Sequence, residues 1–178
     1  MRAIAATLVL LAVAACGVDV PSALADKVRS GCAGAVKPEP VSVIIEGLEV
    51  EDVTGEWSQD GPVNHCSVQV QAGGGSRKAL EVSVNFVGAE MAEKQQRLLC
   101  RERKEGQLIT GPDGSCGLFL AKSRREGVSG GDFSVFGAAG DYAVTITAAG
   151  VSTVADEEGR DAAFRIFSDL RASDQFRK

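Results

Sequence analysis

The five cysteines are the residues whose type and spacing constrain the chemistry of this chain most. Two disulfides among Cys32, Cys66, Cys100 and Cys116 allow three connectivities, and such bonds persist in oxidising compartments outside the cytosol. We favour Cys100 with Cys116, because this bond closes the loop between a predicted helix and a predicted strand and contributes about 3 kcal/mol in the chain-entropy model. Cys32 then pairs with Cys66, for about 4 kcal/mol. The other connectivities and buried free thiols are alternatives, whereas a single histidine and the lack of a C-x-x-C motif argue against a metal site.

Catalysis would need a nucleophile or a pair of carboxylates, and three patterns come into question. His65 adjoins Cys66, but neighbouring side chains of a strand point to opposite faces, and a disulfide-bonded cysteine is no nucleophile. Ser129 lies in a G-x-S-x-G pattern, but no strand-to-helix turn is predicted there and the histidine precedes it. Paired carboxylates for glycoside hydrolysis, or calcium ligands, could come from the acidic stretch with Glu46, Glu49, Glu51, Asp52 and Glu56. Its spacing fits no calcium loop and strand alternation spreads it over two faces, so we expect no catalytic residue, no metal and no cofactor.

Other patterns would serve binding. Trp57 could be a binding aromatic, although a lone tryptophan in a small domain is more often part of the core. The glycines from Gly73 to Gly75 lie between two predicted strands and open no helix, which indicates a hairpin turn rather than a phosphate-binding loop. The formal net charge of −5 gives no support to nucleic-acid binding. A basic patch for phosphate or lipid headgroups could combine Arg101, Arg103, Lys104, Arg124 and Arg125.

The N-terminal segment predicts export and lipid attachment. An apolar run from Ala3 to Ala15 follows Met1-Arg2; it is shorter than a membrane span of about 20 residues and fits the core of a signal peptide. Cys16 comes next, so the segment resembles the lipobox of bacterial lipoproteins, whose cysteine becomes the N-terminus and carries diacylglycerol and an N-acyl chain such as palmitate. Lipidation of Cys16 also leaves an even number of cysteines to pair. Ordinary secretion with cleavage after Ala14 and an unprocessed anchor are the alternatives.

These observations predict the organisation of the chain. Residues 1–15 form the signal peptide, 16–20 the lipidated cysteine with a short tether, 21–172 one domain and 173–178 a tail. Because only four residues separate Cys16 from Pro21, the tether spans at most about 14 Å. We therefore expect the domain close to the extracytoplasmic face of the cell membrane.

Apolar periodicity predicts the elements of the domain. Helical spacing indicates helices from Pro21 to about Val36, over 89–103 and around 163–172. Alternation and β-branched runs indicate a bent strand or two over 41–53, a hairpin of 66–71 with 80–86, and strands over 116–121, 132–136 and 142–148. Residues 107–115 are expected as a loop. The predicted fold class is α+β: an antiparallel sheet of about six strands with helices packed on it, stabilised by two disulfides.

The layout is similar to the small lipoproteins of unknown function found in actinobacteria, through the lipobox, an early Cys32, and Cys66 at the start of an alternating strand. The Gly140-Asp141-Tyr142 segment before a closing helix also matches, whereas those proteins have an aromatic just after the mid-chain cysteine and here Trp57 lies nine residues before it. The resemblance implies a helix-flanked antiparallel sheet like that of PsbP and Mog1 proteins, and carries over no catalytic residue. We expect a non-catalytic binding or accessory module whose partners are the membrane and a small amphiphilic ligand or an envelope protein. The alternatives are a structural or assembly subunit of an envelope complex, and a carboxylate-dependent envelope hydrolase.

Overall fold

A seven-stranded antiparallel sheet is the centre of the computed structural model, which describes residues 19–58, 61–72, 74–101, 107–120, 132–149 and 157–176. The strand order is β1-β2-β3-β7-β6-β5-β4, so the hairpins β2–β3 and β6–β7 lie side by side in the middle of the sheet. The strands are β1 (Glu49–Glu56), β2 (Val63–Ala72), β3 (Gly75–Phe86), β4 (Gln107–Thr110), β5 (Cys116–Leu120), β6 (Asp132–Ala139) and β7 (Tyr142–Ala148).

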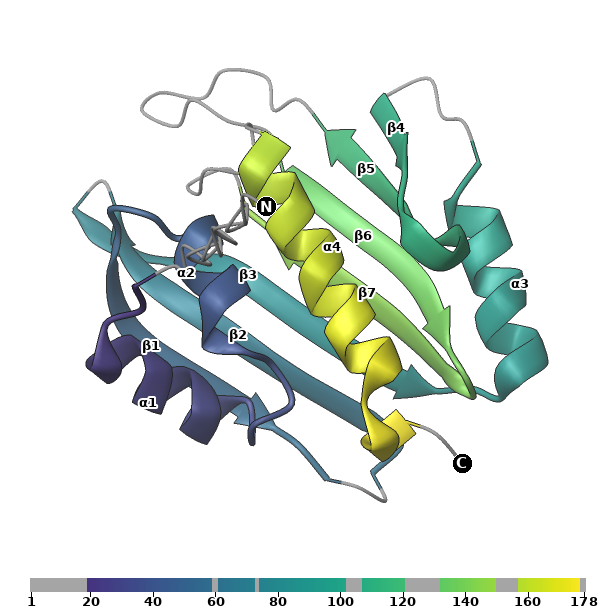
Figure 1. The fold of residues 1–178 in the computed structure, drawn as a ribbon, viewed down its shortest axis with the longest axis horizontal. Coiled ribbons are helices and arrows are strands. Elements are labelled where there is room, and N and C mark those ends of the chain that lie inside the picture. The colour runs from purple at the N-terminus through teal and green to yellow at the C-terminus, as the bar shows by residue number, and fades with distance from the viewer. Residues whose placement is uncertain are drawn as a thin grey trace, which may run out of the picture.

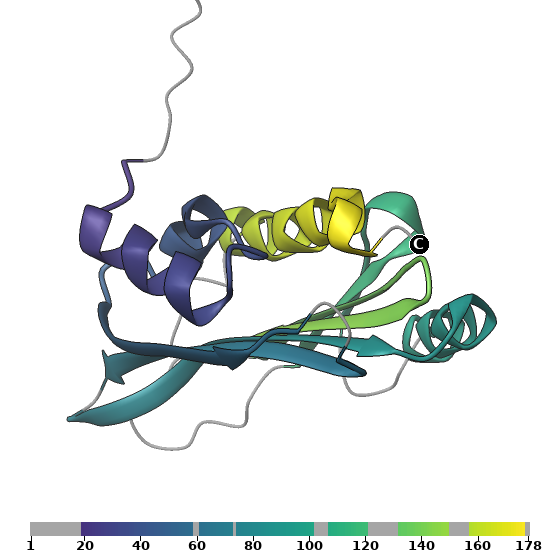
Figure 2. The same ribbon diagram turned by 90° about the horizontal axis from the view of Figure 1, so that it is seen from below.

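Of the helices in the described residues, three cover one face of the sheet (Figure 1, Figure 2). These are α1 (Ser22–Gly31), which lies over β1 and β2, α2 (Pro38–Ile44), and α4 (Glu157–Ala172), which lies over β6 and β7 and contacts α2. The remaining long helix, α3 (Ala89–Leu99), packs against β6 and β7 at the far end of the sheet, apart from the other three. The predicted α+β class is therefore confirmed.

The hydrophobic core lies between the sheet and the layer of three helices. Leu80, Val82 and Val84 of β3 alternate with polar residues and are buried on this face. Phe167 of α4 is also fully buried, and its ring occupies the space that a β-carbon would take on Gly137 of β6. The glycine thus lets α4 approach the sheet more closely than a larger residue would allow.

Two disulfides tie helices to strands. Cys32 at the end of α1 is bonded to Cys66 of β2, with the Cα atoms 5.2 Å apart, and Cys100 at the end of α3 is bonded to Cys116 of β5, with the Cα atoms 5.6 Å apart. These are the two pairs that the sequence favours. The first bond depends on a close approach of α1 to the sheet, because a β-carbon on Gly55 would meet the carbonyl oxygen of Gly31.

The prediction of a strand over 41–45 is wrong, because residues 38–44 form α2. Pro38 stands in the first turn, where the missing amide hydrogen is tolerated. Val41 and Ile44 lie three residues apart on one side of this helix and are fully buried. The β-branched composition favours a strand, but burial of this side against the core outweighs that weak preference.

Other element boundaries also differ from the prediction. α1 ends at Gly31 rather than near Val36, and α3 ends at Leu99 rather than at residue 103. Residues 107–110, expected in a loop, form the edge strand β4 and pair with β5. The described sheet therefore has seven strands where about six were expected.

Candidate functional site

A groove with a volume of about 670 Å³ opens beside the beginning of α1, between α1, the end of α2 and the beginning of β1. Leu24 and Ile45 are buried in it, whereas Val43, Leu48 and Val50 are half-buried, so apolar side chains remain accessible along its walls. Its volume lies within the range of about 300–1,000 Å³ that small-molecule sites occupy. We call this cavity the α1/α2 groove.

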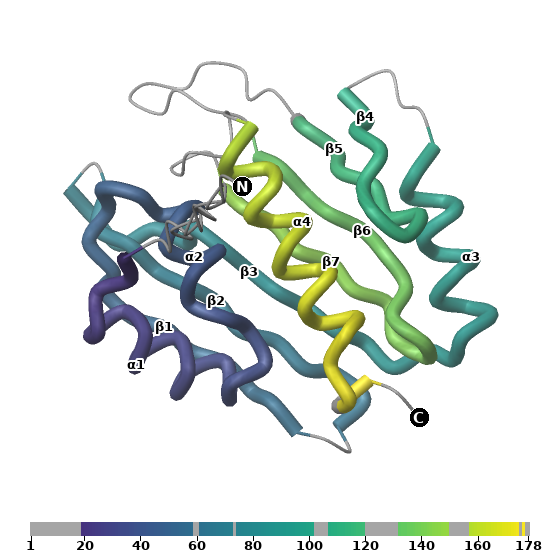
Figure 3. Tube along the Cα trace, viewed as in Figure 1, coloured from purple at the N-terminus to yellow at the C-terminus, as the bar shows by residue number. Residues whose placement is uncertain are grey.

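The turn between α2 and β1 forms one end of the groove. The amide of Leu48 donates a hydrogen bond to the carbonyl oxygen of Ile45 at 2.9 Å, and Gly47 has a φ of 74°, in the left-handed region that glycine enters without strain. In Figure 3 the chain passes from the end of α2 to the start of β1 on the side of the molecule where α1 begins. This turn brings Leu48 and Val50 next to the first turn of α1.

Lys27 fastens α1 to the edge strand at the groove. Its ammonium group donates hydrogen bonds to the carbonyl oxygens of Val50 at 2.8 Å and Glu51 at 3.1 Å. Both carbonyls belong to β1, which is an outer strand of the sheet. The lysine therefore satisfies backbone groups of a sheet edge and holds the wall of the groove in place.

Three exposed carboxylates surround the α1/α2 groove. Asp19 precedes α1, Glu46 follows α2, and Glu158 lies in the first turn of α4. Within the described part of the chain, none of the three has an ion-pair partner. Glu49 also borders the groove, but strand alternation directs its side chain away from the face that Val50 shares with the helices. Lys27 is the single cation among the described lining residues, so the rim carries net negative charge.

The acidic stretch is divided between the α1/α2 groove, which Glu46 and Glu49 border, and the strand beyond it. Glu46 lies in the turn beside the groove, whereas Asp52 and Glu56 stand opposite Gln69 and His65 on the face of β1 away from the helices. Glycoside hydrolysis needs two carboxylates about 5–10 Å apart across one cleft. The register places Glu49, Asp52 and Glu56 on one face of β1, opposite Gln71, Gln69 and His65, because the bulge between Val50 and Asp52 shifts the alternation. The expected spread over two faces is therefore wrong for these three residues.

The histidine and its neighbouring cysteine point in different directions, as expected. Cys66 is buried and bonded to Cys32, whereas His65 is exposed. The Cys–His pair therefore has no free thiol. Arg101 is described and exposed. The remaining predicted site residues lie outside the described residues: Cys16, Arg103, Lys104, Arg124, Arg125 and Ser129.

Trp57 belongs to an aromatic cluster at the other end of β1. It is half-buried, packs against the hydrophobic core and meets Phe176 edge-to-face with the ring centroids 6.2 Å apart. Phe176 in turn contacts Tyr142 at 5.1 Å and is itself buried. This arrangement favours a packing role for Trp57, and it fixes part of the expected polar tail to the domain.

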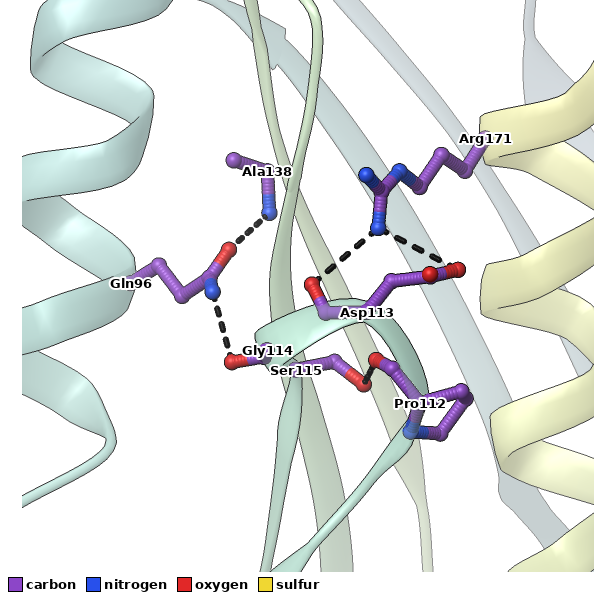
Figure 4. Close-up of polar contacts among 7 residues, drawn as sticks. All are labelled: Gln96, Pro112, Asp113, Gly114, Ser115, Ala138 and Arg171. Atoms are coloured by element: carbon purple, nitrogen blue, oxygen red, sulfur yellow. Dashed lines mark hydrogen bonds and ion pairs between the residues drawn. The ribbon is translucent and has the colours of Figure 1, made fainter.

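A polar cluster that sequence reasoning missed holds the turn Pro112–Gly114 between two helices (Figure 4). From α3, the Gln96 side chain donates to the carbonyl oxygen of Gly114 and accepts from the amide of Ala138, both at 2.6 Å. From α4, Arg171 donates to the carbonyl oxygen of Asp113 at 3.0 Å and pairs with its carboxylate at 3.2 Å. These contacts position the turn before Cys116. The Pro-Asp-Gly sequence signals a turn, but nothing local identifies Gln96 as its partner.

The Gly140-Asp141-Tyr142 segment also has a structural role. The carboxylate of Asp141 accepts a hydrogen bond from the amide of Ala89 at 3.0 Å, and its carbonyl oxygen accepts from the two preceding amides at 3.0 and 2.9 Å. The amides of Val87, Gly88 and Ala89 lie at the start of α3, where backbone donors have no partner within the helix. Asp141 therefore caps α3 from a position 52 residues away in sequence.

The chain has no match among the protein-family models, the curated proteins or the solved structures with which it was compared. In the described residues, no group of three or more histidine, cysteine or acidic side chains is placed to hold a metal ion. The helices of the described part are too short or too polar to cross a membrane. The two disulfides indicate an extracytoplasmic location. The α1/α2 groove is thus the feature from which a function can be argued.

Proposed function

We propose that the protein is a lipid-anchored, extracytoplasmic binding module without catalytic activity, whose α1/α2 groove takes the apolar chain of an amphiphilic ligand. The position of the groove carries this proposal. Asp19 and Pro21 line it, and Asp19 follows Cys16 by three residues, which span at most about 11 Å. A lipid on Cys16 would therefore hold the mouth of the groove beside the headgroups of the membrane.

The shape and chemistry of the groove support an amphiphile as its ligand. Its inner walls combine buried and half-buried aliphatic side chains, and its rim is polar and exposed. An alkyl chain laid against Val43, Leu48 and Val50 would gain about 25 cal/mol for each Å² of apolar surface removed from water. A polar headgroup would stay at the exposed rim. Such a site next to a bilayer can exchange ligands with it over a short distance.

The anchor is tested by labelling cells with an alkyne analogue of palmitate. The mature protein should carry the label and stay with the membrane fraction, whereas the Cys16→Ser variant should lose the label and leave that fraction. Retention of the variant in the membrane, or an unlabelled mature protein, would contradict the anchor.

The groove is tested with the lipidated protein in phosphatidylcholine vesicles and an alkyl maltoside that carries a photoreactive diazirine in its chain. Labelling should concentrate on peptides that contain residues 21–24 and 43–50. The Ala23→Trp variant places an indole at an exposed position of the groove wall and should reduce this labelling at least several-fold. Ala172→Trp adds the same side chain at the exposed end of α4 and should leave it unchanged. Even labelling over the domain, indifferent to Ala23→Trp, would instead favour a structural or assembly subunit.

A further inference from the structure

The α1/α2 groove is charged around its opening and apolar along its walls. Aliphatic side chains form the walls, while the ionisable groups of Asp19, Glu46 and Glu158 are exposed around the opening. These three carboxylates come from three separate segments, before α1, after α2 and at the start of α4. A ligand whose chain enters the groove must therefore leave its headgroup among them.

The ammonium group of Lys27 at this opening already has hydrogen-bond partners within the protein. Lys27 is the lining cation within the described residues, and its ammonium group donates to two carbonyl oxygens of β1 at 2.8 and 3.1 Å. Carboxylates outnumber this one ammonium group among the described lining residues, so the opening carries net negative charge. The start of α4 does not attract a further anion, because Glu157 and Glu158 occupy its first turn.

We infer that the α1/α2 groove selects single-chain amphiphiles with a cationic headgroup. The inference rests on the proposed function of the groove and adds the chemical class of the headgroup. A cation at the opening is attracted by the three carboxylates that border it, and each pair contributes modestly because all three side chains are exposed to water. An anionic headgroup of the same size meets repulsion from the same groups.

The same charges disfavour the most abundant competitors. A groove held at the surface of a bilayer faces a large excess of phospholipid over any single-chain ligand. Carboxylates around the opening repel the headgroup of an anionic lipid. The aliphatic walls contribute the same hydrophobic free energy for any apolar chain of a given length. Discrimination then comes from repulsion of the wrong headgroup as much as from attraction of the right one.

The test compares three photoprobes with one alkyl chain and different headgroups: trimethylammonium, maltoside and sulfate. The lipidated protein is held in phosphatidylcholine vesicles at low ionic strength, and labelling of groove peptides is divided by labelling of peptides from β6 and β7, which carry none of the substitutions. We expect the trimethylammonium probe to exceed the sulfate probe by about tenfold, and the ratio to fall towards one as salt is raised. The triple variant Asp19→Asn, Glu46→Gln and Glu158→Gln should lose most of this preference while keeping the maltoside labelling.

A matched triple variant controls for net charge. Glu56→Gln, Glu90→Gln and Glu93→Gln removes the same three charges from exposed positions away from the groove, and should keep the preference. Equal labelling by all three probes in the unaltered protein would overturn the inference on headgroups while leaving the groove as a chain-binding site. Absence of groove labelling by any probe would overturn the proposed function itself. Loss of the preference in the matched control variant would show that overall charge, not the rim, sets it.

Discussion

Replacing Gly137 with alanine should destabilise the protein, although alanine usually suits a strand better than glycine. The ring of the fully buried Phe167 occupies the position that the new β-carbon would take. Glycine to alanine gains about 0.5–1 kcal/mol from the lower entropy of the unfolded chain, whereas overpacking a filled core costs about 1–3 kcal/mol. Because Phe167 lies between α4 and the sheet, the cost of overpacking should exceed the gain from the lower entropy of the unfolded chain. We expect a net loss of about 1–2 kcal/mol, or about 2–8 °C in Tm.

The assay is equilibrium urea unfolding with the disulfides intact, followed by the fluorescence of the single tryptophan, Trp57. Gly75→Ala is the matched control, because a β-carbon there meets no atom within 4 Å and Gly75 has no left-handed φ. It should be neutral or stabilising by up to about 1 kcal/mol.

A double-mutant cycle with Phe167→Leu separates the clash from other effects of Gly137→Ala. The smaller leucine leaves space for the new methyl group, so the double variant should be more stable than the sum of the single effects by about 1 kcal/mol. Additive effects, or a Gly137→Ala variant as stable as the unaltered protein, would refute the close packing of α4 on β6.

Three further changes test other contacts. Cys100→Ser with Cys116→Ser should lower the free energy of unfolding by about 3 kcal/mol, measured by urea, because the bond closes a loop over a sequence separation of 16. Asp141→Ala should cost about 1 kcal/mol in the same assay by removing the cap of α3, with Asp141→Asn in between. The hydrogen bond and charge of Asp169 raise the pKa of Lys37 above its usual 10.5, so their small contribution to stability is present below that pH and lost as the pH rises through the raised value. Asp169→Asn should remove this decline from stability measured between neutral and strongly alkaline pH, and an unchanged decline would assign it to other groups.

The hairpin β2–β3 could be predicted from sequence because its signal is local. Alternation of Val68 and Val70 with glutamines, a glycine turn and a second alternating run fix both strands and the buried face. The α1/α2 groove could not be predicted, because one of its walls is the end of α2. The β-branched sequence of that segment predicts a strand, and only its burial against the core explains why it forms a helix. The hydrogen bonds of Gln96 with Ala138 and of Asp141 with Ala89 join residues 42 and 52 positions apart in the sequence. A local pattern of apolar and polar residues does not predict contacts over such separations.

The two ends of α1 are held by interactions of different strength, and this difference bears on binding. At Cys32 a covalent bond and the close approach of Gly31 to β1 fix the helix to the sheet. Nearer the groove the helix is held by the buried Leu24 and by the exposed Lys27, whose hydrogen bonds to β1 compete with water. Regions that contact ligands usually belong to the less stable parts of a fold, because they must adjust without unfolding the core. A chain entering the α1/α2 groove would therefore displace the beginning of α1 first, while the cross-linked end and the residues packed beneath it, such as the fully buried Val28, keep their places.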